Sequence, residues 1–141
     1  MATNQVPDAG WHDNHIHAFR IAEGQHGTGE LILDIDHILE WRKADTGDFQ
    51  FLLSPAILTF HEVSHLRMTI DFSTVSAALG PFCISSMSSK DEKREHYMAK
   101  FWTIELGWPQ GEITFEATGF DFELMGEAVV SDHQNLPRVA K

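Results

Sequence analysis

The chain has 141 residues, of which 43% are hydrophobic and 22% are charged, and it contains one cysteine. This composition is that of a globular domain and excludes general disorder, while a lone cysteine excludes an internal disulfide framework. The formal net charge of −11 argues against nucleic acid or an anionic membrane as partner, because both require a basic surface. We expect one domain over 1–141 with flexible ends at 1–10 and 133–141. Since no secretory signal and no long apolar run is visible, we also expect a cytoplasmic location.

Alternation of apolar and polar residues, typical of half-buried strands, begins at residue 15. Residues 15–22 form the first predicted strand, and a glycine-rich loop at 23–29 leads to a second strand at 30–41. These two strands are predicted to form a hairpin. Shorter strands are predicted at 49–53, 56–60, 66–72 and 81–87, with Pro55 ending the first of them.

Residues 90–99 are rich in charge and are the one good helix candidate, with Ser88 or Ser89 as the N-cap. Alternation returns at 101–108 and 112–118, which predicts a second hairpin with a turn at Pro109. A last strand is expected at 120–131. Many short strands joined by turns predict an all-β, mainly antiparallel domain. It would be a sandwich or a curled, barrel-like sheet with at most one or two short helices.

Residues 61–65, His-Glu-Val-Ser-His, match the pattern H-E-x-x-H. On a helix this spacing places two histidines on one face for zinc, and the glutamate between them polarises a water molecule. The surroundings oppose a helix, because Pro55 precedes the segment and a strictly alternating strand begins at 66. We therefore expect a loop between two antiparallel strands, and His61, Glu62 and His65 are the less favoured metal site.

A second group of possible metal ligands stands at the start of the first predicted strand, namely His12, Asp13, His15 and His17. His15 and His17 would share one face of a strand, a spacing that suits a non-helical site for zinc, manganese or iron. The simpler interpretation is a turn in which Asp13 bonds to the backbone, followed by ordinary surface histidines.

Acidic residues dominate the second half of the chain, and no lysine or arginine occurs between residues 101 and 137. Alternation places carboxylates on the polar side of both predicted hairpins. The favoured function is a non-catalytic interaction module without a cofactor, and its acidic face would bind a basic protein. This face would comprise Asp34, Asp36, Glu105, Glu112 and Glu116. The alternatives are a metal-dependent enzyme that uses one of the two histidine groups, and a carrier of a small apolar ligand.

The sequence resembles a family of small bacterial domains to which no activity is assigned. The likeness is carried by W-H-D-x-x-I-H over residues 11–17 and L-D-I-D-x-I-L-E-W over residues 33–41. It continues with P-A-x-L-x-F at 55–60 and I-E-L-x-W-P-x-G-E-I at 104–113. The resemblance implies no catalytic residue. In general character, small acidic β-rich chains are also similar to immunity proteins that neutralise toxins.

Overall fold

The structure is a computed structural model that describes residues 11–24, 28–43, 49–73 and 81–131. The described residues form antiparallel strands and no helix, so none of them belongs to a helix that could cross a membrane. The predicted flexible ends lie outside the described residues. The strands are β1 (His15–Glu23), β2 (Gly29–Lys43), β3 (Phe49–Ile70), β4 (Phe82–Lys93), β5 (Met98–Trp108), β6 (Gln110–Glu116), β7 (Gly119–Leu124) and β8 (Val129–Ser131).

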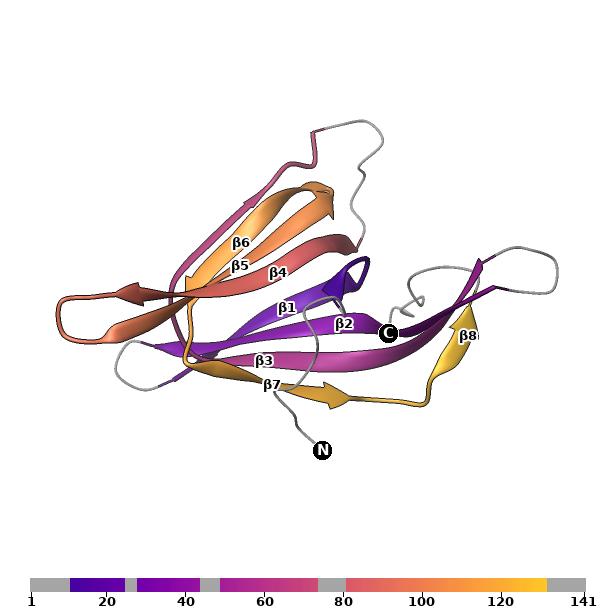
Figure 1. Cartoon of the computed structure of the whole chain (residues 1–141), viewed down its shortest axis with the longest axis horizontal. Helices are drawn as coiled ribbons and strands as arrows, with labels where there is room; N and C mark the ends of the chain where they lie inside the picture. The colour runs from indigo at the N-terminus through magenta and orange to yellow at the C-terminus, as the bar shows by residue number, and fades with distance from the viewer. Residues whose placement is uncertain (1–10, 25–27, 44–48, 74–80, 132–141) are drawn as a thin grey trace.

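The strands make a single sheet in the order β2-β1-β4-β5-β6-β3-β7, and β8 also pairs with β3. Because β2 pairs with β3 as well, this order closes into a ring. Figure 1 shows β1, β2, β3 and β7 side by side in one layer, with β4, β5 and β6 in a second layer above them. The ring is closed by few backbone pairs between β1 and β4, because the described residues of these strands pair only at His15 and Ile16 of β1. The all-β antiparallel prediction is confirmed, in the form of one curled sheet.

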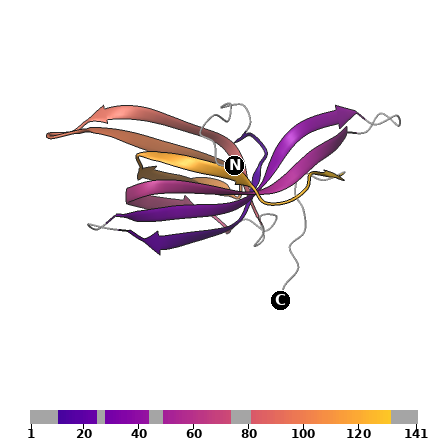
Figure 2. The same ribbon diagram turned by 90° about the horizontal axis from the view of Figure 1, so that it is seen from below.

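β3 is the strand that connects the two layers. It pairs with β2 over residues 49–63, with β8 and β7 along its first part, and with β6 over residues 64–70. The prediction of separate strands at 49–53, 56–60 and 66–72 is therefore wrong. Pro55 is tolerated inside β3 because it lies between the residues that pair with β8 and those that pair with β7. Figure 2 shows the end of β2 and the start of β3, which pairs with β8 there, extending as an arm away from most of the sheet.

The core lies between the two layers and is built from alternate residues of the strands. Leu31, Leu33 and Ile35 of β2 are fully buried on one side of the first layer. Phe60 of β3 is at the centre of an aromatic group. Its ring centroid lies 4.7 Å from that of Phe115, 5.1 Å from that of Trp102 and 5.6 Å from that of Phe120. This packing fixes the inner side of each strand, and hence which side chains face outward.

Both predicted hairpins are confirmed. β1 pairs with β2 along residues 15–23, and β5 pairs with β6 so that Glu105 lies opposite Glu112. Gly111 is the second residue of β6 and lies where this strand passes very close to β3. A Cβ atom at this position would lie 2.1 Å from the carbonyl oxygen of Thr69, so only glycine allows the approach.

The predicted helix at 90–99 is wrong. β4 continues to Lys93 and β5 begins at Met98, and the backbone N–H of Arg94 donates to the carbonyl oxygen of Tyr97 to close the turn. Lysines, glutamates and an arginine favour a helix in isolation, but cross-strand pairing from Lys93 to Lys90 overrides that preference.

Candidate functional site

Residues 61–65 form no helix, as the sequence analysis expected, but the loop predicted in its place is wrong. The segment lies inside β3 at the point where the strand passes from one layer to the other. Glu62 and His65 have φ values of 53° and 56°, which are left-handed conformations that cost free energy in residues other than glycine. The pairing with β6 is also irregular between Ser64 and Arg67. We call residues 61–65 the β3 bend.

His61 joins three strands on the outer side of the first layer. Its Nδ1 atom lies 2.8 Å from Glu30 Oε2 on β2, and its Nε2 atom lies 2.8 Å from Asp121 Oδ2 on β7. Desolvation opposes protonation, but the hydrogen bonds to Asp121 and Glu30 outweigh it and raise the pKa of His61 above its ordinary value. Each ring nitrogen of His61 therefore contacts a carboxylate of the same chain.

His65 belongs to a different group, centred on the buried carboxylate of Glu116. His65 Nδ1 lies 3.2 Å from Glu116 Oε2, and the Arg94 guanidinium donates to the same oxygen at 2.6 Å. The Tyr97 hydroxyl donates to Glu116 Oε1 at 3.1 Å. Desolvation alone would raise the pKa of Glu116, but the bonds from Arg94 and Tyr97 lower it. Through Glu116, the ion pair with Arg94 and the contact with His65 connect the β4–β5 turn to the β3 bend.

Ser64 does not complete a nucleophilic triad with His65 and Glu116. The Ser64 hydroxyl oxygen lies 3.0 Å from His65 Nδ1, the same nitrogen that faces Glu116. A serine–histidine–acid relay requires the hydroxyl and the carboxylate at opposite ring nitrogens. The geometry at the bend therefore lacks the arrangement needed to activate Ser64.

The four residues of the N-terminal histidine group do not converge on one point. His12 Nδ1 lies 3.0 Å from Asp13 Oδ2 at the surface. His17 Nε2 instead lies 2.6 Å from Asp36 Oδ2, and the two side chains are 8% and 0% exposed. An irregularity between Ile16 and Ala18 sets His17 apart from the regular pairing of β1 with β2. Among the described residues, no three histidine, cysteine, aspartate or glutamate side chains are grouped so that they could hold a metal ion.

Buried polar groups continue around the histidine group. The Asn14 amide lies 2.9 Å from His37 Nδ1 and accepts a hydrogen bond from the Ile38 N–H at 3.0 Å. Burial lowers the pKa of His15 and of His37, so both favour the neutral form. Burial, together with the Asp13 carboxylate, raises the pKa of the Cys83 thiol to about 11. These groups fasten residues 11–14 to β2 and β4 and have the character of a structural network.

The five predicted acidic residues do not form one exposed face. Asp36 and Glu116 are buried and paired, so their assignment to a docking surface is wrong. Glu105 and Glu112 are exposed and face each other across β5 and β6. Asp34 lies on β2, in the other layer of the sheet.

A denser acidic surface covers the outer side of the first layer. The pairing registers place Ala18, Asp34, Ile57 and Glu123 in one row across β1, β2, β3 and β7, and Arg20, Ile32, Thr59 and Asp121 in the next. Glu30 and His61 follow at the end of the face. We call this surface the β2–β3–β7 face. Sequence reasoning missed Asp121 and Glu123 because the pairing of β7 with β3 leaves no local signal. Glu30, at the start of β2, was also outside the predicted acidic face.

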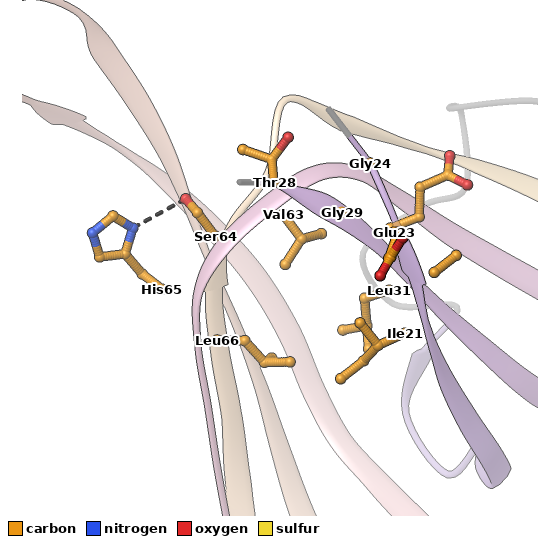
Figure 3. A pocket seen from close by; sticks show the side chains of 12 residues that line it. Ile21, Glu23, Gly24, Thr28, Gly29, Leu31, Val63, Ser64, His65 and Leu66 are labelled. Carbon is orange, nitrogen blue, oxygen red and sulfur yellow. Dashed lines mark hydrogen bonds between the residues drawn. The ribbon is translucent and has the colours of Figure 1, made fainter. Parts of the chain in front are cut away.

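Three hollows surround the β3 bend. One of about 560 Å³ is edged by Glu23, Glu30 and His61, and one of about 460 Å³ lies beside Glu116 and Tyr97. The third, of about 470 Å³, lies between the β1–β2 hairpin and β3 and has an apolar lining. Figure 3 shows Ile21, Leu31, Val63 and Leu66 around this apolar hollow, while His65 points away from it.

Taken together, these features give a bent β3 with an acidic outer face, an apolar hollow and two histidines held by internal carboxylates. Comparison of the chain with protein-family models, with curated proteins and with solved structures finds no match. The resemblance to small bacterial domains therefore rests on the quoted sequence patterns alone.

Proposed function

We propose that this chain is a non-catalytic interaction module that binds a basic protein through the β2–β3–β7 face. The observation that carries the proposal is the row in which Asp34 and Glu123 flank the half-buried Ile57. Carboxylates beside partly exposed aliphatic side chains offer a basic partner both charge complementarity and apolar contact.

The outer side of the second layer provides the contrast. There, one row across β4, β5, β6 and β3 reads Ser86, Glu105, Glu112 and Thr69, and the next reads Ser88, Thr103, Thr114 and Arg67. These two rows contain no apolar side chain. They have the composition of a solvated surface, and so the acidic residues of this layer are the weaker candidate.

The β2–β3–β7 face is also held rigid. His61 bridges Glu30 and Asp121, so two of its carboxylates are positioned by a contact that spans β2, β3 and β7. Positioned groups lose less conformational entropy on binding than free side chains do. A raised pKa of His61 keeps this bridge in its charged form over more of the neutral range.

The test uses two variants that remove the same number of charges from different faces. One carries Asp34→Asn with Glu123→Gln, and the matched control carries Glu105→Gln with Glu112→Gln. The probe is a fluorescein-labelled oligolysine peptide, and its affinity is measured by fluorescence anisotropy at low and at near-physiological salt.

We expect the variant of the β2–β3–β7 face to bind the peptide about fivefold more weakly, since each exposed charge contact contributes up to about 1 kcal/mol. The control variant should change the affinity much less, and salt should weaken the wild-type complex steeply. Equal weakening by both variants would mean that only the net charge matters, and it would overturn the proposal.

A further inference from the structure

We propose that the partner binds by adding an extended strand to the outer edge of β1, alongside the β2–β3–β7 face. This inference rests on the proposed function and specifies the conformation and side-chain pattern of the partner. Its basis is the pairing of β1, the exposure of two apolar side chains on it, and the charges that lie one strand further in.

Among the strands that the structure describes, none lies beside the outer edge of β1 over most of its length. Within the described residues, β4 pairs with β1 only at His15 and Ile16, whereas β1 pairs with β2 from His15 to Glu23. The segment 18–23 therefore presents backbone hydrogen-bonding groups on one side. Such an edge is a template for another extended chain.

Apolar side chains stand uncovered along this same edge. Phe19 and Ile21 lie opposite Leu33 and Leu31, which are fully buried, so all four share the core side of the layer. Nevertheless Phe19 is 44% exposed and Ile21 is 63% exposed. The apolar hollow begins at Ile21 (Figure 3). An added strand would lie about 4.8 Å from β1, and its apolar side chains would cover Phe19 and Ile21 and enter the hollow.

The side chains on the outward-facing side of β1 determine which charges are favourable in the partner strand. Ala18, Arg20 and Ala22 face outward, next to Asp34, Ile32 and Glu30 of β2. Because alanine is small, a lysine or arginine opposite Ala18 or Ala22 can extend over β1 toward the carboxylates. Opposite Arg20, a glutamate is favourable. The partner segment thus has the pattern basic, apolar, acidic, apolar, basic.

A second copy of this chain is a poor occupant of the same edge. Antiparallel pairing of two β1 strands would bring together two acidic faces of a molecule with a net charge of −11. The net negative charge of the chain therefore favours a segment of a different, basic protein.

The test uses the peptide Lys-Val-Glu-Val-Lys, acetylated and amidated, and a scrambled peptide, Lys-Lys-Glu-Val-Val, of equal composition and charge. The pattern is palindromic, so it suits parallel and antiparallel addition alike. Titration is followed by amide chemical shifts and amide hydrogen exchange of the whole chain, which detect weak binding. We expect the alternating peptide to shift the amides of residues 18–23 and slow their exchange, and to bind at least fivefold more tightly than the scrambled peptide.

Ile21→Asn should lower the affinity for the alternating peptide about tenfold, since it removes an apolar side chain that the peptide would bury. Met98→Asn is the matched control, because Met98 is also 63% exposed but lies on β5. Equal affinity for the two peptides, with the oligolysine result intact, would overturn strand addition and leave the proposed function standing. If the alternating peptide binds at 18–23 and its affinity is unchanged in the variant Asp34→Asn with Glu123→Gln, strand addition would be supported and the acidic face would be contradicted. Concentration-dependent dimerisation that Ile21→Asn abolishes would assign the edge to a second copy and overturn the inference.

Discussion

The buried pair of His17 and Asp36 gives the sharpest test of how the N-terminal segment is held. The imidazole and the carboxylate are 2.6 Å apart, and both are almost completely removed from solvent. Replacing His17 with leucine removes the imidazole partner of a buried carboxylate, and breaking a buried pair in this way typically costs 3–5 kcal/mol. Because Asp36 keeps a further interaction, we expect the lower end, about 3 kcal/mol.

Urea denaturation followed by tryptophan fluorescence measures this loss. With a dependence of about 2 kcal/mol per molar urea for a chain of this size, the midpoint should fall by about 1.5 M. The double variant His17→Leu with Asp36→Leu should lose less stability than His17→Leu alone, since the buried carboxylate that lost the imidazole is gone. His96→Leu is the control, because the His96 side chain is 85% exposed and its loss should leave the midpoint unchanged.

Two results would refute the reasoning. A midpoint for His17→Leu within experimental error of the wild type would show that the pair does not hold β1 to β2. Stabilisation of the wild type by added zinc, absent in His17→Leu, would show that the pair is part of a metal site.

Three further predictions concern other parts of the sheet. His61→Gln should destabilise the chain most at about pH 6 and least near pH 8.5. The pKa of His61 is raised in the folded state, so the stability it contributes is complete below the unfolded-state pKa and is lost as pH rises through the folded-state pKa. Urea midpoints of the wild type and the variant at each pH test this. A difference between the two midpoints that stays constant with pH would contradict it. Cys83 should react slowly with iodoacetamide at pH 8 until urea unfolds the chain, because its pKa is about 11; mass spectrometry would reveal the fast labelling that disproves this. Phe60→Ala should cost about 3–5 kcal/mol, since the ring is fully buried among three aromatic rings, and a loss below 1 kcal/mol by urea denaturation would be inconsistent with that packing.

Local patterns predicted the hairpins but not the long strand. The alternation at 15–22 and 30–41 predicts the first hairpin, because residues that pair across this hairpin are also close in sequence. The sequence predicts three separate strands in place of β3, because Pro55 and four polar residues, His61, Glu62, Ser64 and His65, interrupt the apolar run. The continuous strand also depends on pairing with β6, β7 and β8, which lie far along the chain.

The sequence predicts which strands carry acidic residues but not which of these residues are buried. Alternation placed Asp36 on the polar side of β2, and that side is normally exposed. The irregularity at His17 brings an imidazole over this carboxylate, and no period in the sequence signals it. Glu116 is likewise on the polar side of β6, where Arg94 and Tyr97 from a distant turn cover it. Burial of these two carboxylates is a tertiary effect.

The length of β3 also bears on how the chain folds as it is synthesised. Its first edge can pair with β2 as soon as residue 70 has left the ribosome, but its second edge must wait for residues 110–131. During this interval an unpaired edge that includes Leu58 and Phe60 is available to other nascent chains. Contacts between segments so distant in sequence form slowly, and exposed strands of this kind aggregate. Production of soluble protein should therefore depend more on the rate of synthesis and on temperature than the final stability would suggest.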